Sequence, residues 1–218
     1  MNTPASSPQV QNHEQVARPP SGWLMLLVTV ALYAGAIALF IAGARGRAGI
    51  EMAAGVIGLI TAVLMSCGFF TLQPNEGAVL ILFGAYRGSV RASGFFFTNP
   101  FNKRLKISLR ARNLNSEKLK VNEKRGNPIE IAAVVVWRVQ DTAQAVFDVD
   151  SYENYVKIQS ESAVRHVASS YAYDDGEPNE LTLRGGSEEV SAALTRELQE
   201  RLAKAGVHVE EARLTHLA

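Results

Sequence analysis

The chain contains two stretches of 21 residues without a charged side chain, WLMLLVTVALYAGAIALFIAG (residues 23–43) and MAAGVIGLITAVLMSCGFFTL (residues 52–72). A bilayer core of roughly 30 Å is crossed by about 20 helical residues, so each stretch is long enough to span. The first holds ten Leu, Ile, Val or Phe residues and the second nine, which favours insertion of both. The link between them, ARGRAGIE (residues 44–51), is short and polar. The sequence therefore predicts a transmembrane helical hairpin over residues 23–72.

A cleaved signal peptide is the competing interpretation, because Ala42-Gly43-Ala44 resembles a cleavage site. A signal peptide has a basic leading region and an apolar run of roughly 7–15 residues. Here Arg18 is the only basic residue before the run, the run is longer, and a second apolar stretch follows. These features favour a permanent anchor.

The two apolar stretches contain no Asp, Glu, Lys, Arg or His. Ion pathways and proton relays need such groups at membrane depth, so a channel or transporter is disfavoured. Small residues also recur at every fourth position, which permits close helix packing in lipid but is equally explained by the abundance of Ala and Gly in membrane helices. They are Ala34, Ala38 and Ala42 in the first stretch, and Ala54, Gly58, Ala62 and Ser66 in the second.

Residues 1–22 and the orientation of the hairpin are less strongly specified. Residues 1–22 hold four Pro with Ser, Asn and Gln and no periodicity, so we expect a disordered N-terminal segment. Arg45 and Arg47 draw the link toward the cytoplasm, whereas Arg18, Arg87 and Arg91 draw the outer flanks the same way. The positive-inside rule leaves the orientation open.

Residues 73–218 read as one soluble domain in which strands precede helices. Leu105, Ile107 and Leu109 alternate with polar residues, the period of a half-buried strand. The expected strands are residues 77–83, 94–101, 104–110, 119–121, 129–139 and 207–214, with a turn at residues 84–88. The expected helices are residues 142–147 capped by Asp141, a long helix begun by Asp150 and Glu153 as a capping box, and a helix capped by Ser187 and ended by Gly206. The fold class is therefore α+β.

Charge is distributed unevenly along this domain. Residues 84–125 carry a balance of +9 and residues 126–218 a balance of −8. A basic region next to a membrane anchor can bind anionic headgroups, or it can contact the acidic region of a second copy. The third possibility is that both charged regions are solvent-exposed faces without a partner. We favour the first two together and expect no nucleic-acid partner, since no recognition motif accompanies the charge. The membrane-facing or inter-subunit basic patch is assigned to Lys103, Arg104, Lys106, Arg110 and Arg112.

We find no constellation that carries catalysis. The four His are scattered, one Cys cannot form a pair, and no phosphate loop or dinucleotide fingerprint is present. The acidic cluster Asp174-Asp175-Gly176-Glu177 lacks the alternating spacing of a calcium loop. We expect no metal, no cofactor and no enzymatic activity; the visible candidates for an overlooked site are Glu161, His166 and Asp174.

The order of features resembles a known family. An N-terminal anchor leads into QPNEGAV (residues 73–79), then a Phe83-Gly84 turn, GFFF (residues 94–97), Pro100-Phe101, and a long strand ending VWRV (residues 136–139). This arrangement is similar to the SPFH domain of stomatin, prohibitin and flotillin, over about residues 77–217. Two full spans replace the single span or shallow hairpin of many members. The chain also ends at Ala218 without the usual Ala/Glu-rich coiled coil, so either it is a fragment or assembly rests on the domain and hairpin.

The resemblance implies a non-enzymatic, membrane-attached domain that self-associates into a large ring-like homo-oligomer. It implies a scaffold that organises membrane microdomains and sequesters or regulates membrane proteins. A regulatory subunit of a membrane-bound protease complex is the alternative with the same fold. We expect the bacterial inner (plasma) membrane, with the domain on the cytoplasmic side.

Overall fold

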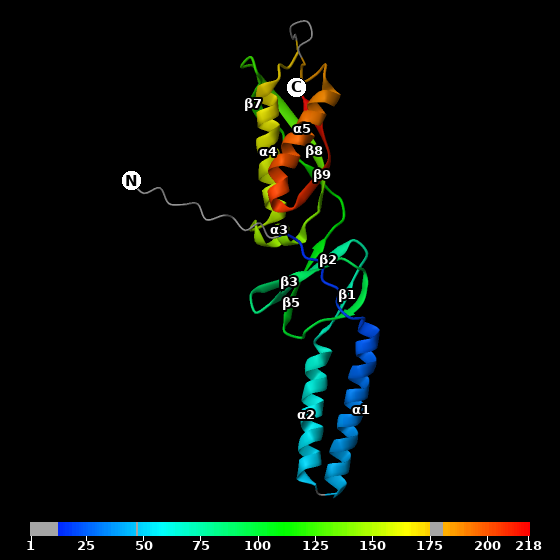
Figure 1. Cartoon of the computed structure of the whole chain (residues 1–218). Helices are drawn as coiled ribbons and strands as arrows, with labels where there is room; N and C mark the ends of the chain where they lie inside the picture. Colours follow the sequence, from blue (N-terminus) through cyan, green and yellow to red (C-terminus); the bar gives the residue numbers. More distant parts are fainter. Residues whose placement is uncertain (1–12, 47, 175–180) are drawn as a thin grey trace, which may run out of the picture. The chain divides into compact units, whose positions relative to one another are not determined.

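In the computed structural model, which describes residues 13–46, 48–174 and 181–218, the chain divides into two units (Figure 1). The first, here called the hairpin unit, comprises residues 15–108. The second, the sheet–helix unit, comprises residues 109–218 and the N-terminal residues up to Glu14. The α+β class is confirmed, since an apolar two-helix hairpin is followed by antiparallel strands and then helices.

The hairpin consists of helices α1 (Gly22–Gly46) and α2 (Gly49–Ser66), which run side by side (Figure 1). Both are long and apolar enough to cross a membrane, and only 11% of each apolar window is buried. The buried residues of the two helices recur seven apart: Thr29, Ala36 and Gly43 on α1, with Gly55 and Ala62 on α2. Gly58 of the expected four-residue series also lies at the contact, since a Cβ there would be 2.9 Å from the Ala36 Cβ. A heptad spacing is that of left-handed helix pairs. The exposed Ala34, Ala38 and Ala42 therefore lie off the contact.

Helix α2 ends at Ser66, six residues before the expected end of the apolar stretch. The remainder forms strand β1 (Phe69–Leu72), which pairs antiparallel with β4 (Gly94–Phe97). Hydropathy could not show this boundary, because a Phe-rich strand is as apolar as a helix and the paired residues lie 22 to 28 positions apart in sequence.

The second sheet of the hairpin unit has the order β3-β2-β5. Its strands are β2 (Glu76–Leu82), β3 (Ala85–Val90) and β5 (Asn102–Ser108), all antiparallel. The β2–β3 turn is Phe83-Gly84, so the turn expected at residues 84–88 lies largely within β3. A buried hydrophobic cluster of this unit contains Phe70, Leu72, Ala78, Leu80 and Val90.

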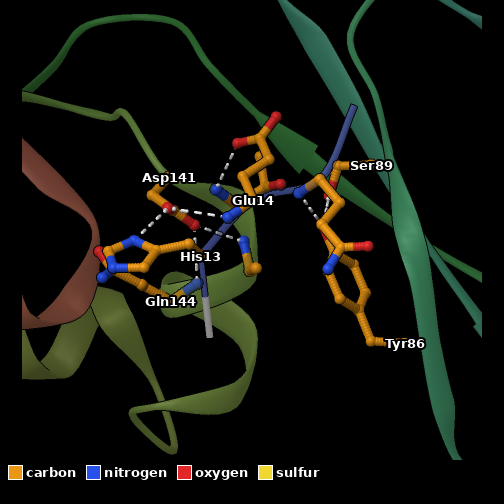
Figure 2. A network of polar contacts seen from close by, with 9 residues as sticks. His13, Glu14, Tyr86, Ser89, Asp141 and Gln144 are labelled. Carbon is orange, nitrogen blue, oxygen red and sulfur yellow. Dashed lines mark hydrogen bonds and ion pairs between the residues drawn. The ribbon is translucent and has the colours of Figure 1, made fainter. Parts of the chain in front are cut away.

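The N-terminal lead-in differs from the expected disordered segment over residues 13–21. In the sheet–helix unit, the Glu14 backbone N–H donates to Asp141 Oδ2 (3.1 Å), a bond shown in Figure 2. The Glu14 side chain also takes part, since its Oε2 accepts from the Thr142 N–H (2.9 Å). In the hairpin unit, the Gln15 carbonyl accepts from the Ser89 N–H (2.7 Å). Backbone pairing, which composition does not report, orders these residues; residues 1–12 lie outside the described part.

The sheet–helix unit is built around one long strand, β8 (Pro128–Val139), as expected for residues 129–139. It pairs on one side with β6 (Arg112–Asn115) and β7 (Leu119–Asn122), and on the other with β9 (Val207–Leu217). Every pairing is antiparallel. The buried face of β8 holds Ile131, Val135 and Trp137.

Three α-helices accompany this sheet: α3 (Thr142–Phe147), α4 (Tyr152–Ser170) and α5 (Ser187–Leu202). Asp141 caps α3 as expected, with Oδ1 accepting from the Ala143 and Gln144 N–H groups. Ser151, not Asp150, caps α4, and α5 begins after Gly186 without a side-chain cap. A short 3-10 helix η1 (Ala203–Ala205) extends α5 and ends at Gly206, whose φ is 64°. The apolar stripe of α5 is fully buried: Val190, Leu194, Leu198 and Leu202.

Candidate functional site at the base of the helical hairpin

The residues next to both helix ends at the open end of the hairpin are bonded to the end of strand β4, at Phe97 and at Thr98 directly after it. The Gly68 carbonyl, two residues after α2, accepts from the Thr98 N–H (2.9 Å). The Pro20 carbonyl, two residues before α1, accepts from the Phe97 N–H (3.2 Å). The start of α1 and the end of α2 are therefore joined to consecutive residues, Phe97 and Thr98, of the same unit, and this region is called the hairpin base below.

Aromatic rings surround the hairpin base. Trp23 at the start of α1 meets Phe95 edge-on (centroids 5.5 Å apart), Phe95 stacks on Phe69 (5.3 Å), and Phe69 meets Phe97 edge-on (5.1 Å). Trp, here Trp23, is a residue type enriched at membrane–water interfaces. Because strand residues alternate, Phe96 points the other way and packs against the core instead. The sequence showed the aromatic run GFFF, but not that it divides between two faces.

Two glycines permit this close approach. A Cβ at Gly68 would overlap the Thr98 carbonyl oxygen and lie 2.5 Å from the Phe97 ring. A Cβ at Gly22 would lie 2.5 Å from the Phe95 ring. Neither Gly is needed for an unusual φ; both are needed for space. The rings can therefore pack this closely only because Gly22 and Gly68, at the two helix ends, have no side chain.

Arg104 on β5 is bonded to the C-terminal end of α2. Its Nη2 donates to the Cys67 carbonyl (2.7 Å) and its Nη1 to the Phe69 carbonyl (2.9 Å), while the guanidinium lies over the Phe70 ring (5.8 Å). The last carbonyls of a helix lack intrahelical donors and carry partial negative charge, so a guanidinium fork is well suited to this place. Arg104 therefore stabilises the junction between the anchor and the sheet.

The five residues assigned to a basic patch do not share one environment. Lys103 is exposed, Arg104 is bonded at the hairpin base, and Lys106 pairs with Glu76 (3.7 Å). Because β5 side chains alternate, Lys103 lies on one face of its sheet and the other two on the opposite face. Arg110 and Arg112 belong to the sheet–helix unit. The role assigned to the patch stays a prediction.

Arg112 belongs to a cluster within the sheet–helix unit. It forms an ion pair with Glu153 and lies over the rings of Trp137 (5.6 Å) and Tyr152 (5.8 Å), which meet edge-on. Burial raises the pKa of Tyr152 above its usual value, and the neighbouring Arg112 charge opposes this only in part. The arrangement ties β6 to α4, and it explains Arg112 by structure without a lipid or a second copy.

The residues considered for chemistry lie apart from one another. Glu161 and His166 are on α4, with His166 exposed, and Asp174 pairs with Arg184 (3.0 Å). The remainder of the acidic cluster, residues 175–177, lies outside the described residues. Within residues 13–46, 48–174 and 181–218, no group of three His, Cys, Asp or Glu side chains could hold a metal ion. Cys67 is a free thiol at the C-cap of α2.

These features define an α+β domain preceded by two apolar helices, an arrangement compatible with a membrane protein. A family model, SPFH domain / Band 7 family, matches residues 70–218. The match covers more than half of the chain, and the chain therefore belongs to the SPFH family, as its motifs predicted. Members of this family are generally membrane-associated, non-enzymatic scaffolds. A search of curated proteins found no matching sequence.

Proposed function

We propose that this chain is a membrane-anchored subunit of an oligomeric SPFH scaffold that organises membrane microdomains and sequesters or regulates membrane proteins. The observation that carries the proposal is the hairpin base. Two exposed apolar helices are attached to the first strands of the family domain by backbone hydrogen bonds, aromatic rings and Arg104. A tether of this kind suits a domain that works at the membrane surface, since a flexible linker would not hold it there.

We infer that the hairpin base faces the cytoplasm. The hairpin unit carries Arg18, Arg87, Arg91 and three further basic residues of β5, whereas Arg45 and Arg47 lie at the link. Positive charge near membrane-helix ends favours the cytoplasmic side. On a Cys67→Ser background, single cysteines at position 103 and at position 44 report the two sides in spheroplasts. A membrane-impermeable maleimide should label position 44 only; labelling at position 103 alone would reverse the orientation.

Self-association is supported by the opposite charges of the two units. The hairpin unit has eight Lys or Arg against two Asp or Glu, and the sheet–helix unit has 14 against 19. A contact between unlike units of neighbouring copies is heterologous and builds rings or filaments. The complex extracted in mild detergent should therefore be many times heavier than one chain by mass photometry. A monomer or dimer at low salt would contradict the scaffold.

The charge contact itself needs a variant that leaves the fold intact. Arg104 and Lys106 are unsuitable because both have partners within the hairpin unit. Lys103→Glu reverses an exposed charge of that unit, and Lys204→Glu reverses an exposed charge of the already acidic sheet–helix unit. We expect Lys103→Glu to reduce complex mass at low salt and Lys204→Glu to leave it unchanged. Equal masses for both variants would remove Lys103 from the contact.

The regulatory subunit of a membrane protease is the alternative for the same fold. Crosslinking in native membranes followed by mass spectrometry separates the two roles. Crosslinks from position 103 mainly to further copies of this chain support a scaffold, whereas stoichiometric recovery of one protease would favour the alternative. The same experiment identifies client proteins, which the fold does not specify.

A further inference from the structure

The β2–β3 turn contains a residue that its backbone conformation disfavours. Leu82 pairs with Ala85, so Phe83 and Gly84 form a two-residue hairpin loop with φ values of 49° and 87°. Positive φ at both positions is the type I′ geometry, for which Asn-Gly or Asp-Gly is preferred, and a bulky residue there is an outlier. The other non-Gly residue with positive φ in the described chain is Asn75, at the opposite end of β2, where the residue type suits the turn. Phe83 is therefore not explained by turn chemistry.

Phe83 is not explained by packing either. Its side chain is 86% exposed, and it stacks on Phe101, which is 61% exposed (centroids 6.1 Å apart). Neither ring belongs to the core of the hairpin unit. An exposed aromatic pair held on a disfavoured turn points to a contact outside the described residues.

A series of contacts links the strand ends that carry this pair to the hairpin base. Leu82, before Phe83, pairs with Asn102, which follows Phe101. The Asn102 side-chain amide donates to Thr98 Oγ1 (2.7 Å), and the Thr98 N–H donates to the Gly68 carbonyl just after α2. The strand ends that carry Phe83 and Phe101 are thus joined through Asn102 and Thr98 to Gly68, just after the apolar helix α2.

A groove of about 390 Å³ lies beside the same strand ends, within the hairpin unit. Its polar lining includes Arg18, Arg87 and Asn99, and its apolar lining includes Leu82 and Phe97. Both arginines are exposed, and in the described part of the chain neither has an acidic partner. Guanidinium groups bind phosphate oxygens in bidentate fashion, and an apolar floor suits the glycerol and upper acyl carbons of a lipid.

We propose that this groove and the Phe83–Phe101 pair form a binding site for an anionic phospholipid of the leaflet at the hairpin base, an inference that rests on the membrane anchoring proposed above. Arg18 and Arg87 bind the headgroup phosphate. The two rings enter the boundary between headgroups and acyl chains, where the Phe and Leu side chains of membrane-surface segments are buried. Water-exposed phenyl rings thereby gain an apolar environment that the fold does not provide.

The first test measures depth in nanodiscs that contain the full chain. On a Cys67→Ser background, bimane is attached at Phe83→Cys or, as the matched control, at Asn75→Cys at the other end of β2. We expect quenching by doxyl-labelled lipid to be at least threefold stronger at position 83. Equal quenching at the two positions would overturn the proposal. Carbonate extraction of the cell membranes that contain the chain tests the anchor separately from the lipid site, because release of the chain into the supernatant would contradict the membrane anchor itself.

The second test addresses the headgroup. With native Phe83 retained, nanodiscs of phosphatidylcholine alone are compared with nanodiscs containing phosphatidylglycerol, and the lipid carried with the chain into mild detergent is counted by native mass spectrometry. We expect the native chain to retain phosphatidylglycerol preferentially. The double variant Arg18→Gln/Arg87→Gln should reduce this retention at least fivefold, whereas the control Arg45→Gln should leave it unchanged. Retention unaffected by the double substitution, or abolished equally by millimolar inorganic phosphate in the native and doubly substituted chains, would overturn the site.

Phe83→Asn distinguishes a lipid contact from a structural role. It restores the preferred Asn-Gly turn, so the thermal midpoint of the detergent-solubilised chain should stay equal or rise while retention of phosphatidylglycerol falls. A lower midpoint would mean that Phe83 serves the fold, and would overturn the proposal.

Discussion

The hairpin unit and the sheet–helix unit hold their apolar side chains in opposite ways. Among the residues that the structure describes, 19 of the 22 exposed large hydrophobic side chains belong to the hairpin unit. In the sheet–helix unit the aliphatic stripe of α5 is at 0% exposure and faces β9 and α4. Apolar surface of this extent is stable only if the surrounding medium is apolar too. The difference teaches that α1 and α2 expose apolar surface in a way compatible with a membrane, whereas the sheet–helix unit buries its own.

The comparison also extends to how each unit is joined internally. The hairpin base relies on Phe rings, missing side chains and one guanidinium that caps a helix. The sheet–helix unit relies on an aliphatic core with ion pairs at its surface. If this distinction is correct, a substitution in one unit should destabilise that unit and leave the other unit protected against hydrogen exchange.

The largest effect is expected from Leu194→Ala in the core of the sheet–helix unit. Leu194 is fully buried, so the substitution leaves a cavity and should lower the free energy of unfolding of that unit by about 2–5 kcal/mol. Hydrogen exchange should show faster opening of α5 and β9, with no change in β1–β4. Leu181→Ala, at an exposed Leu, is the control, expected within about 0.5 kcal/mol. Equal loss of protection in both units would mean that they unfold as one.

Gly68→Val tests the other side of the comparison. The added side chain would collide with Thr98 and the Phe97 ring, and overpacking of this kind typically destabilises by about 1–3 kcal/mol. Exchange should increase in β1 and β4 while β8 remains protected. Gly35→Val is the matched control, because no atom lies within 4 Å of a Cβ at that position of α1. Unchanged exchange in β4 would show that the hairpin base is not held by close packing.

Arg112→Lys sharpens the distinction between a structural and a surface charge. Lys keeps the charge but lacks the planar group that lies over Trp137 and Tyr152, so we expect a loss of about 1 kcal/mol. Lys106 is more exposed than Arg112 (47% against 34%), and its ion pair with Glu76 involves no aromatic ring, so Lys106→Gln should change stability by less than about 0.5 kcal/mol. Thermal unfolding of both variants measures the difference. A larger loss for Lys106→Gln would reverse this assignment.

The smallest effect concerns pH and belongs to the sheet–helix unit alone. Because burial raises the pKa of Tyr152 in the folded chain, the unfolded chain loses this proton first as pH rises past the ordinary value of 10.0. The contribution of Tyr152 to stability is therefore complete below that pH and is lost above it. Between pH 9 and 11.5 the thermal midpoint of the native chain should fall more than that of Tyr152→Phe. Parallel decline of the two would contradict the raised pKa.

Some features followed directly from local sequence. Residues 129–139 are rich in β-branched residues and form β8, and the apolar stripe from Val190 to Leu202 forms a buried helix face. Asp141 caps α3 because its carboxylate reaches N–H groups only two and three residues away. These elements were predictable because the interactions that specify them lie within a turn or two of the chain.

Other features were not predictable. Ser151 and not Asp150 caps α4, and residues 15–17 pair with Ser89 although their composition indicated disorder. The basic residues 103–112 looked like one patch, yet alternation and the division into units give Lys103, Arg104 and Arg112 three different environments. In each case the partner is selected by three-dimensional proximity, which local patterns do not encode.

Hydropathy, strand and helix periods and motif order specify the apolar hairpin, the α+β class and membership of the SPFH family. These are properties of side chains and their near neighbours in the chain. The end of α2, the division of the Phe run between two faces and the exposure of Phe83 and Phe101 depend on which distant strand each segment pairs with. Pairing of β1 with β4 and β2 with β5 is settled by long-range hydrogen bonds and ring packing, and these contacts exist only in the folded chain.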